Sequence, residues 1–273
     1  MIQIKGIFRL HSDTPFFLIL GIIGSVYIIL IVAMIMADLS FTSVSHIVSA
    51  LKSEEIQYSI KLSLFTCTIT MFLSVLVAIP LGYLLANYNF PGKKMIDSLI
   101  DVPIILPPLV VGLSLLILFQ TAPGQWIERH VQVTYAIPSI ILAQFMVAAA
   151  FAVRTMKITF MQINRRQEEV ALTLGCSRAQ AFRYVVLPQA KEGMLTAGSL
   201  AWARALGEFG PILIFSGATR MKTEVLSTTV FLEMSIGNIE AAVAVSLLMI
   251  FAAFMVLTLV RLLGNKKYRV YPV

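Results

Sequence analysis

Two charged residues, Arg204 and Glu208, lie inside an otherwise apolar stretch of the sequence. They are four residues apart, so a helix would bring both side chains to one face. An unpaired arginine at the centre of a bilayer costs about 2.5–3.5 kcal/mol on insertion scales, unless it is paired or faces water. The spacing predicts an internal ion pair that fixes helix packing. A role in a gate, or in direct contact with a substrate, stays open.

The other residues able to do chemistry are too scattered to form a catalytic site. The three histidines stand singly, without a second ligand at helical spacing. Cys67 lies in an apolar run and Cys176 in a basic polar loop, so we expect no disulfide between them. The sequence has no Gly-x4-Gly-Lys-Ser/Thr pattern, so ATP cannot be bound here by a P-loop. We therefore expect neither an enzyme nor a metal site.

The composition is that of a membrane protein. Of 273 residues, 58% are hydrophobic and only 13% are charged, against about 25% charged in soluble domains. A disordered chain, a disulfide-stapled secreted domain and an ordinary cytosolic enzyme are excluded on this ground. The net charge of +7 is better explained by orientation in a bilayer than by binding to nucleic acid.

Six apolar runs are each long enough to cross about 30 Å of hydrocarbon as a helix. They cover about 16–36, 62–86, 99–119, 137–160, 194–215 and 239–263. We predict an all-α polytopic membrane protein that forms one transmembrane domain over residues 1–273. Its first helix is an uncleaved span at about 16–36, and its core covers about 60–263.

The distribution of positive charge predicts the orientation. If the N-terminus is inside, fifteen of the Lys and Arg residues fall in inner segments and five in outer ones. Cytoplasmic segments carry the excess of such residues, so both termini are expected in the cytoplasm.

Proline and glycine interrupt two of the spans. Pro107 and Pro108 remove two adjacent backbone donors from the third span, and Gly210 precedes Pro211 in the fifth. Irregular backbone at membrane depth is tolerated where it is buried in protein or lines an aqueous path. The candidate pathway or gate residues are Pro107, Pro108, Arg204, Glu208 and Gly210.

The long inner segment at about 164–190 is predicted to form a helix–turn–helix between the fourth and fifth spans. Gly175 is a suitable left-handed terminator for its first helix, Ser177 can cap the second, and Pro188 is expected to end it. Val170 and Leu174 contribute to an apolar stripe along one face.

The same segment carries a longer motif. Glu169 and Ala171 are followed by Gly175 and, after nine intervening residues, by Val185-x-Leu187-Pro188. This pattern resembles the EAA loop of type I ABC importer permeases, with Val170 in place of the first alanine. The resemblance implies that Glu169, Ala171, Leu174, Gly175, Leu187 and Pro188 form a coupling helix that docks into a groove of an ATP-hydrolysing subunit.

Further stretches resemble the molybdate, tungstate and sulfate permeases. They are Pro80–Ala86, Phe90–Lys94, Val102–Gly112 and Arg204–Gly210, and the likeness covers about residues 50–262. It is closest to the molybdate/tungstate branch. The resemblance implies a multi-pass protein of the plasma (inner) membrane, embedded in the lipid bilayer, that works as a homodimer. It also implies two cytoplasmic ABC ATPase subunits and an extracytoplasmic oxyanion-binding protein. ATP and Mg²⁺ would be bound by the ATPase, with no cofactor in this chain and no nucleic acid.

The sequence leaves three alternatives for the function. Sulfate or thiosulfate, or another binding-protein-dependent substrate, could be moved by the same mechanism. An ion-coupled secondary transporter would use Arg204 and Glu208 as a relay, but the two halves of the chain do not mirror each other and the 164–190 segment would be unexplained. An intramembrane enzyme lacks a converging catalytic constellation.

Overall fold

The computed structural model describes residues 14–264, which form helices joined by short loops and contain no strand. Four helices are long and apolar enough to cross a membrane. They are α1 (Thr14–Phe41), α3 (Glu54–Asn87), α7 (Ile137–Gln162) and α14 (Ile239–Gly264). They confirm the predicted first, second, fourth and sixth spans, although α3 begins well before residue 62. Lys5, Arg9, Lys266, Lys267 and Arg269, which contributed to the predicted orientation, lie outside the described residues.

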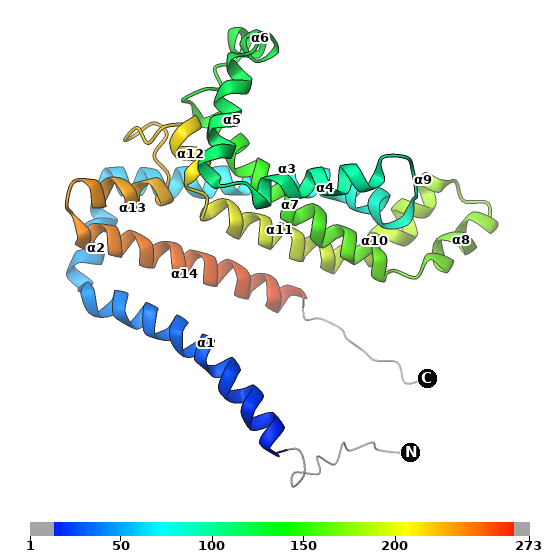
Figure 1. The fold of residues 1–273 in the computed structure, drawn as a ribbon, viewed down its shortest axis with the longest axis horizontal. Coiled ribbons are helices and arrows are strands. Elements are labelled where there is room, and N and C mark those ends of the chain that lie inside the picture. Colours follow the sequence, from blue (N-terminus) through cyan, green and yellow to red (C-terminus); the bar gives the residue numbers. More distant parts are fainter. Residues whose placement is uncertain (1–13, 265–273) are drawn as a thin grey trace.

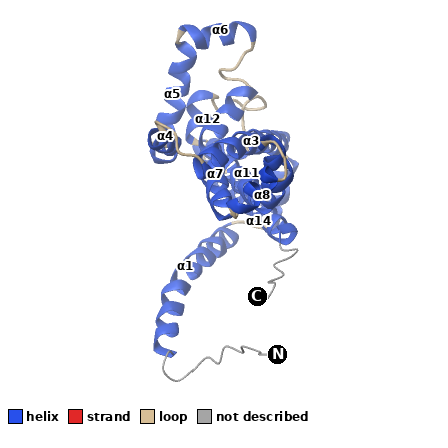
Figure 2. Ribbon diagram, turned by 90° about the vertical axis from the view of Figure 1, so that its right-hand side faces the viewer, coloured by secondary structure: helices blue, strands red, loops and turns tan. Residues whose placement is uncertain are grey.

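The centre of the bundle is formed by α3, α7 and α11 (Lys191–Leu206), which run side by side (Figures 1 and 2). Small side chains let these helices approach closely, as is common in membrane bundles. A Cβ on Gly82 of α3 would lie 2.8 Å from the Cβ of Met156 on α7. The buried face of α3 also carries Ser63, Thr70 and Ala78. Close packing of small residues therefore holds the core.

The predicted third span is not one helix. It consists of α4 (Lys93–Ile105) and α5 (Pro108–Gln120), whose axes differ by 111°. Two adjacent residues without backbone N–H groups cannot continue a helix, and Pro108 instead occupies the first turn of α5, where no donor is needed. Consequently α5 projects from the bundle with α6 (Ala122–His130) at its tip (Figure 1).

The predicted fifth span is also divided. Its first part, α11, ends at Leu206, and its second part is the short helix α12 (Gly210–Phe215). The helix α13 (Leu226–Ser235) follows and packs on α14. The helices α2 (Val44–Lys52) and α13 lie at one end of the bundle, while α1 diverges from it on the side opposite α5 (Figure 1).

At the other end of the bundle lies a series of short helices, which we call the α8–α10 segment. It comprises α8 (Arg165–Thr173), α9 (Arg178–Ala181), the π-helical turn η1 (Phe182–Val186) and α10 (Leu187–Gln189). The helix–turn–helix prediction is confirmed in outline, but Pro188 does not end the second helix. The π turn shifts the hydrogen-bond ladder, with Leu187 N donating to the Phe182 carbonyl, so Pro188 falls in the first turn of α10.

Candidate functional site

The turn after α8 is built by Gly175. Its φ of +92° is in the left-handed region, which glycine adopts without steric cost. The N–H of Gly175 donates to the Leu172 carbonyl and that of Cys176 to the Ala171 carbonyl, both at 3.1 Å. These two bonds form a Schellman motif, so the predicted role of Gly175 as helix terminator is confirmed.

The following helix begins with a capping box at Ser177. The Ser177 hydroxyl accepts from Gln180 N at 3.3 Å, and Gln180 Oε1 accepts from Ser177 N at 2.8 Å. Two backbone donors are satisfied reciprocally, which fixes where the second helix starts. The turn between the two helices is thus defined on both sides by local chemistry.

The α8–α10 segment is anchored to the end of α3 by aromatic and charged side chains. Tyr83 donates a hydrogen bond to the carboxylate of Glu168 and packs its ring 4.7 Å from that of Phe182. The hydroxyl of Tyr88 accepts from Arg178 at 3.2 Å. Glu168, which the sequence did not single out, is therefore the buried carboxylate of this segment.

The remaining predicted residues of the segment divide into an exposed and a covered set. Glu169, Val170 and Leu174 lie on the outer surface of α8 and form what we call the α8 face. Leu174 is 80% exposed and Val170 is 56% exposed. Ala171 faces inward and is buried. Leu187 and Pro188 lie farther along, in the helical stretch that leads into α11.

The two interrupted spans meet each other. A Cβ on Gly210 would lie 2.7 Å from the Cβ of Pro108, and one on Gly112 would lie 2.8 Å from the Cα of Pro211. The structure therefore brings the break after Pro107 into contact with the break before Gly210. At these distances, a residue larger than glycine does not fit at position 112 or at position 210.

The predicted ion pair lies at the second break. The guanidinium of Arg204 is 2.7 Å from the carboxylate of Glu208, and the Glu208 side chain is only 2% exposed while that of Arg204 is 30% exposed. Ser227 on α13 donates to the backbone carbonyl of Glu208 at 2.7 Å. The pairing predicted from the i, i+4 spacing is confirmed, and one charge of the pair is enclosed by protein.

A buried amide supports the same region and was not identified from the sequence. Gln144 on α7 donates to the carbonyl of Ala205 at 3.2 Å and accepts from the hydroxyl of Thr70 at 3.1 Å. The Ala205 carbonyl, in the last turn of α11, also accepts from Glu208 N at 3.2 Å. Gln144 thereby joins α3, α7 and the end of α11.

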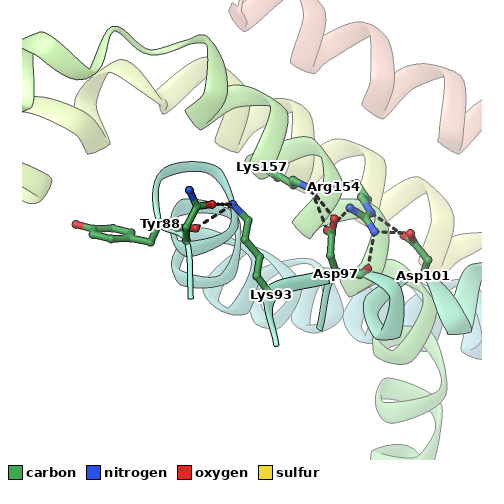
Figure 3. A network of polar contacts seen from close by, with 7 residues as sticks. Tyr88, Lys93, Asp97, Asp101, Arg154 and Lys157 are labelled. Carbon is green, nitrogen blue, oxygen red and sulfur yellow. Dashed lines mark hydrogen bonds and ion pairs between the residues drawn. The ribbon is translucent and has the colours of Figure 1, made fainter. Parts of the chain in front are cut away.

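A second charged cluster, also missed by sequence reasoning, joins α4 to α7 (Figure 3). Arg154 donates from Nε to Asp101 Oδ1 at 2.6 Å and from Nη2 to the Asp97 carbonyl at 2.6 Å. Lys157 Nζ is 2.8 Å from Asp97 Oδ2. Helix α4 begins at Lys93, so Asp97 and Asp101 lie within it, on the side that meets α7.

Two interrupted helices that meet within a bundle of long apolar helices, together with an anchored helical segment at one end, are features of a multi-pass membrane protein. Among residues 14–264 there is no group of His, Cys, Asp or Glu that could hold a metal ion. Residues 78–267 match the binding-protein-dependent transport system inner membrane components, and the chain belongs to that family. It is a transport subunit of the inner membrane rather than an enzyme.

The chain is similar to permeases named for different oxyanions. It is 31% identical over 209 residues to the sulfate transport system permease protein CysT of Salmonella typhimurium, which covers 76% of each chain. It is 35% identical over 173 residues to the molybdate/tungstate transport system permease protein WtpB of Thermococcus kodakarensis, covering 63% of this chain and 66% of that one. In fold it resembles a chain of a bacterial alginate ABC transporter, with a TM-score of 0.73 at 19% identity over 94% of this chain and 96% of that one.

Proposed function

We propose that this chain is the permease subunit of an ATP-driven importer for a tetrahedral oxyanion. Molybdate or tungstate is the favoured cargo, and sulfate or thiosulfate is the alternative. The observation that carries this proposal is the similarity to permeases of both kinds, because sulfate, molybdate and tungstate share one shape and charge.

We propose six crossings, with both termini in the cytoplasm. Four of them are the long helices, and the α4–α5 and α11–α12 pairs provide two interrupted crossings. The interrupted backbone is supported in this position because the two breaks cover each other. In this arrangement the α8–α10 segment lies in the cytoplasm.

A cytoplasmic α8–α10 segment supports a docking role for the α8 face. Leu174 and Val170 expose apolar side chains where neither lipid nor the rest of the chain covers them, and the carboxylate of Glu169 lies beside them. We propose that this face enters a groove of a separate ATPase subunit, which binds ATP and Mg²⁺. An ion-coupled transporter would leave the α8 face without a partner.

The complete transporter is proposed to contain two copies of this chain, two ATPase subunits and an extracytoplasmic oxyanion-binding protein. Helix α1 has no buried residue and a strongly apolar sequence, which supports contact with lipid or a second copy. Selectivity would reside in the external protein. Weak contacts along the path suit a compact dianion, because tight binding would retain it.

Several of the candidate residues have a proposed task in the cycle. Gly175 and Ser177 hold the shape of the docking turn, and α7 and α11 carry its movement into the bundle. The contact between Pro108 and Gly210 changes as the path opens. The Arg204–Glu208 pair keeps the second break folded, since Glu208 would otherwise be a buried charge without a counterion.

The test is uptake by proteoliposomes that contain the permease with its ATPase and binding protein. Radiolabelled molybdate and sulfate are supplied outside, with ATP inside. We expect ATP-dependent accumulation of one labelled anion, and we expect the other anions of the series to reduce its uptake by competition. Calorimetry of the binding protein with molybdate, tungstate, sulfate and thiosulfate ranks them. A binding protein that ignores all four anions would overturn the oxyanion assignment while leaving the permease family intact.

A further inference from the structure

The helix α4 has an unusual position in the bundle, because none of its residues is buried. It packs against α7, and its exposed side chains include Met95 and Leu99. A helix that buries so little apolar surface gains little free energy from packing. Polar contacts must therefore contribute much of what holds α4 in place.

Four of the charged residues labelled in Figure 3 make the contacts that hold it, and we call them the charge clamp: Asp97, Asp101, Arg154 and Lys157. Arg154 makes a bidentate contact with the Asp101 carboxylate through two guanidinium nitrogens, a geometry that lysine cannot provide. Asp97 is shared, since both Arg154 and Lys157 contact its carboxylate. The cluster has two positive and two negative groups, so it is neutral as a unit.

Both ends of α4 are suited to pivot. At its start, Gly92 has a φ of +84°, and at its end the chain turns by 111° at Leu106 and Pro107. An intact helix between two such turns moves as a rod. Its position is then set by whatever the clamp is attached to.

The clamp attaches α4 to the helix that enters the α8–α10 segment. Helix α7 ends at Gln162 and α8 begins at Arg165. A second tether reaches the same segment. Lys93 donates to the Tyr88 carbonyl at 2.9 Å (Figure 3). The Tyr88 ring in turn lies 5.9 Å from the Arg165 guanidinium. Movement of this segment is thereby imposed on α4 at two points.

The far end of α4 continues into the contact between the two breaks. Three residues after Ile105, Pro108 starts α5 against Gly210, where there is no space for even one methyl group. A shift of α4 cannot be absorbed at that contact and must displace α5 or α12. The route from the α8 face to the breaks is therefore continuous.

We propose that the charge clamp is the link that makes α4 move with α7, so that ATPase-driven movement of the α8–α10 segment reaches the Pro108–Gly210 contact. Asp97, Asp101, Arg154 and Lys157 are thus positioning residues for transport and need not touch the anion. This inference rests on the proposed importer function. It predicts that loss of the charge clamp uncouples ATP hydrolysis from anion uptake.

The first test measures the ratio of anion uptake to ATP hydrolysis in the reconstituted complex. We expect Asp101→Asn and Arg154→Gln each to lower this ratio about tenfold while ATP hydrolysis continues. Combining Asp101→Arg with Arg154→Asp should recover part of the ratio. Lys94→Gln, at an exposed position on the same helix, serves as the control and should leave the ratio unchanged. A purely structural cluster would lower uptake and hydrolysis together, and that result would overturn the proposal.

The second test replaces the clamp by a covalent link. Asp97→Cys and Lys157→Cys are introduced after Cys67 and Cys176 are replaced, and a short bis-maleimide joins the new thiols. The unlinked protein should hydrolyse ATP with little uptake, and cross-linking should restore the ratio. If cross-linking blocks uptake, α4 must move relative to α7 and the inference is wrong. Absence of ATP-driven uptake by the unmodified complex would instead refute the proposed function.

Discussion

Leu174 offers the most direct measurement of the proposed docking role. It is 80% exposed at the tip of α8, where the Gly175 turn holds it away from the rest of the chain. We expect Leu174→Ala to weaken the binding of the ATPase subunit without changing the permease itself. The substitution leaves the helix intact, because alanine is an excellent helix former.

The size of the effect follows from the surface that leucine exposes. Leu174→Ala removes three carbon atoms, each contributing about 0.8 kcal/mol when fully buried. Scaled by the 80% exposed fraction, this gives about 2 kcal/mol, or about a thirtyfold rise in the dissociation constant. Val170 exposes 56% of its surface, and Val170→Ala removes two carbons, so a rise of about fivefold is expected.

The assay is titration of the detergent-purified permease with the isolated ATPase subunit, followed by calorimetry or by fluorescence. The matched control is Leu76→Ala on α3, since Leu76 is 68% exposed but lies in an apolar helix covered by lipid or detergent. The reasoning is refuted if Leu174→Ala binds the ATPase normally. It is also refuted if Leu76→Ala has an equal effect, because the loss would then come from general destabilisation.

Three further predictions concern single residues. Gly175→Val should weaken ATPase binding and uptake by distorting the turn, since a β-branched residue at φ of +92° is strained by about 1–2 kcal/mol. Gly175→Asn serves as the control, because asparagine tolerates that conformation, and it should retain more ATPase binding and more uptake than Gly175→Val. Gly210→Ala should impair uptake but not ATPase binding, because its methyl group would meet Pro108 at 2.7 Å; Gly198→Ala, with 3.5 Å to its nearest neighbour, should have little effect on uptake. Burial raises the pKa of Glu224, in the loop before α13, above its usual value, with Thr229 and Arg220 only partly opposing the rise. When the pKa of a carboxyl is higher in the folded protein than in the unfolded chain, its contribution to stability is fully present below the ordinary pKa. That contribution is lost as the pH rises through the pKa of the folded protein. Glu224→Gln should therefore have a higher Tm than the parent near neutral pH, and the difference should shrink below about pH 4 in a series of thermal melts. A constant difference at all pH values would contradict this explanation.

Local chemistry determined the features that could be predicted from the sequence. The Gly175 turn, the Ser177 cap and the Arg204–Glu208 pair each involve residues within a few positions of one another. Their hydrogen bonds close within a single turn, so spacing alone is sufficient. The same holds for the interruption at Pro107 and Pro108, although the size of the bend depends on what surrounds it.

The charge clamp could not be predicted, because its acidic and its basic members lie more than fifty residues apart in the sequence. A signal was present, since Asp97 and Asp101 share one helical face and Arg154 and Lys157 share another. Spacing does not show that these two faces meet. The same limit explains why Glu168 was overlooked beside Glu169, since its partner Tyr83 is contributed by a distant helix.

The contact between the two breaks explains why both interruptions are tolerated and why glycines lie beside them. A helix interrupted at membrane depth leaves backbone groups without partners, and lipid cannot satisfy them. Placing the start of α5 against the start of α12 shields both, and it requires Gly112 and Gly210 where the two backbones come together. Such a contact cannot be adjusted on one side only, because there is no free volume to absorb a shift. Under the proposed coupling, a force that reaches α5 through α4 must therefore also reach α12, and with it Glu208, two residues before α12 begins.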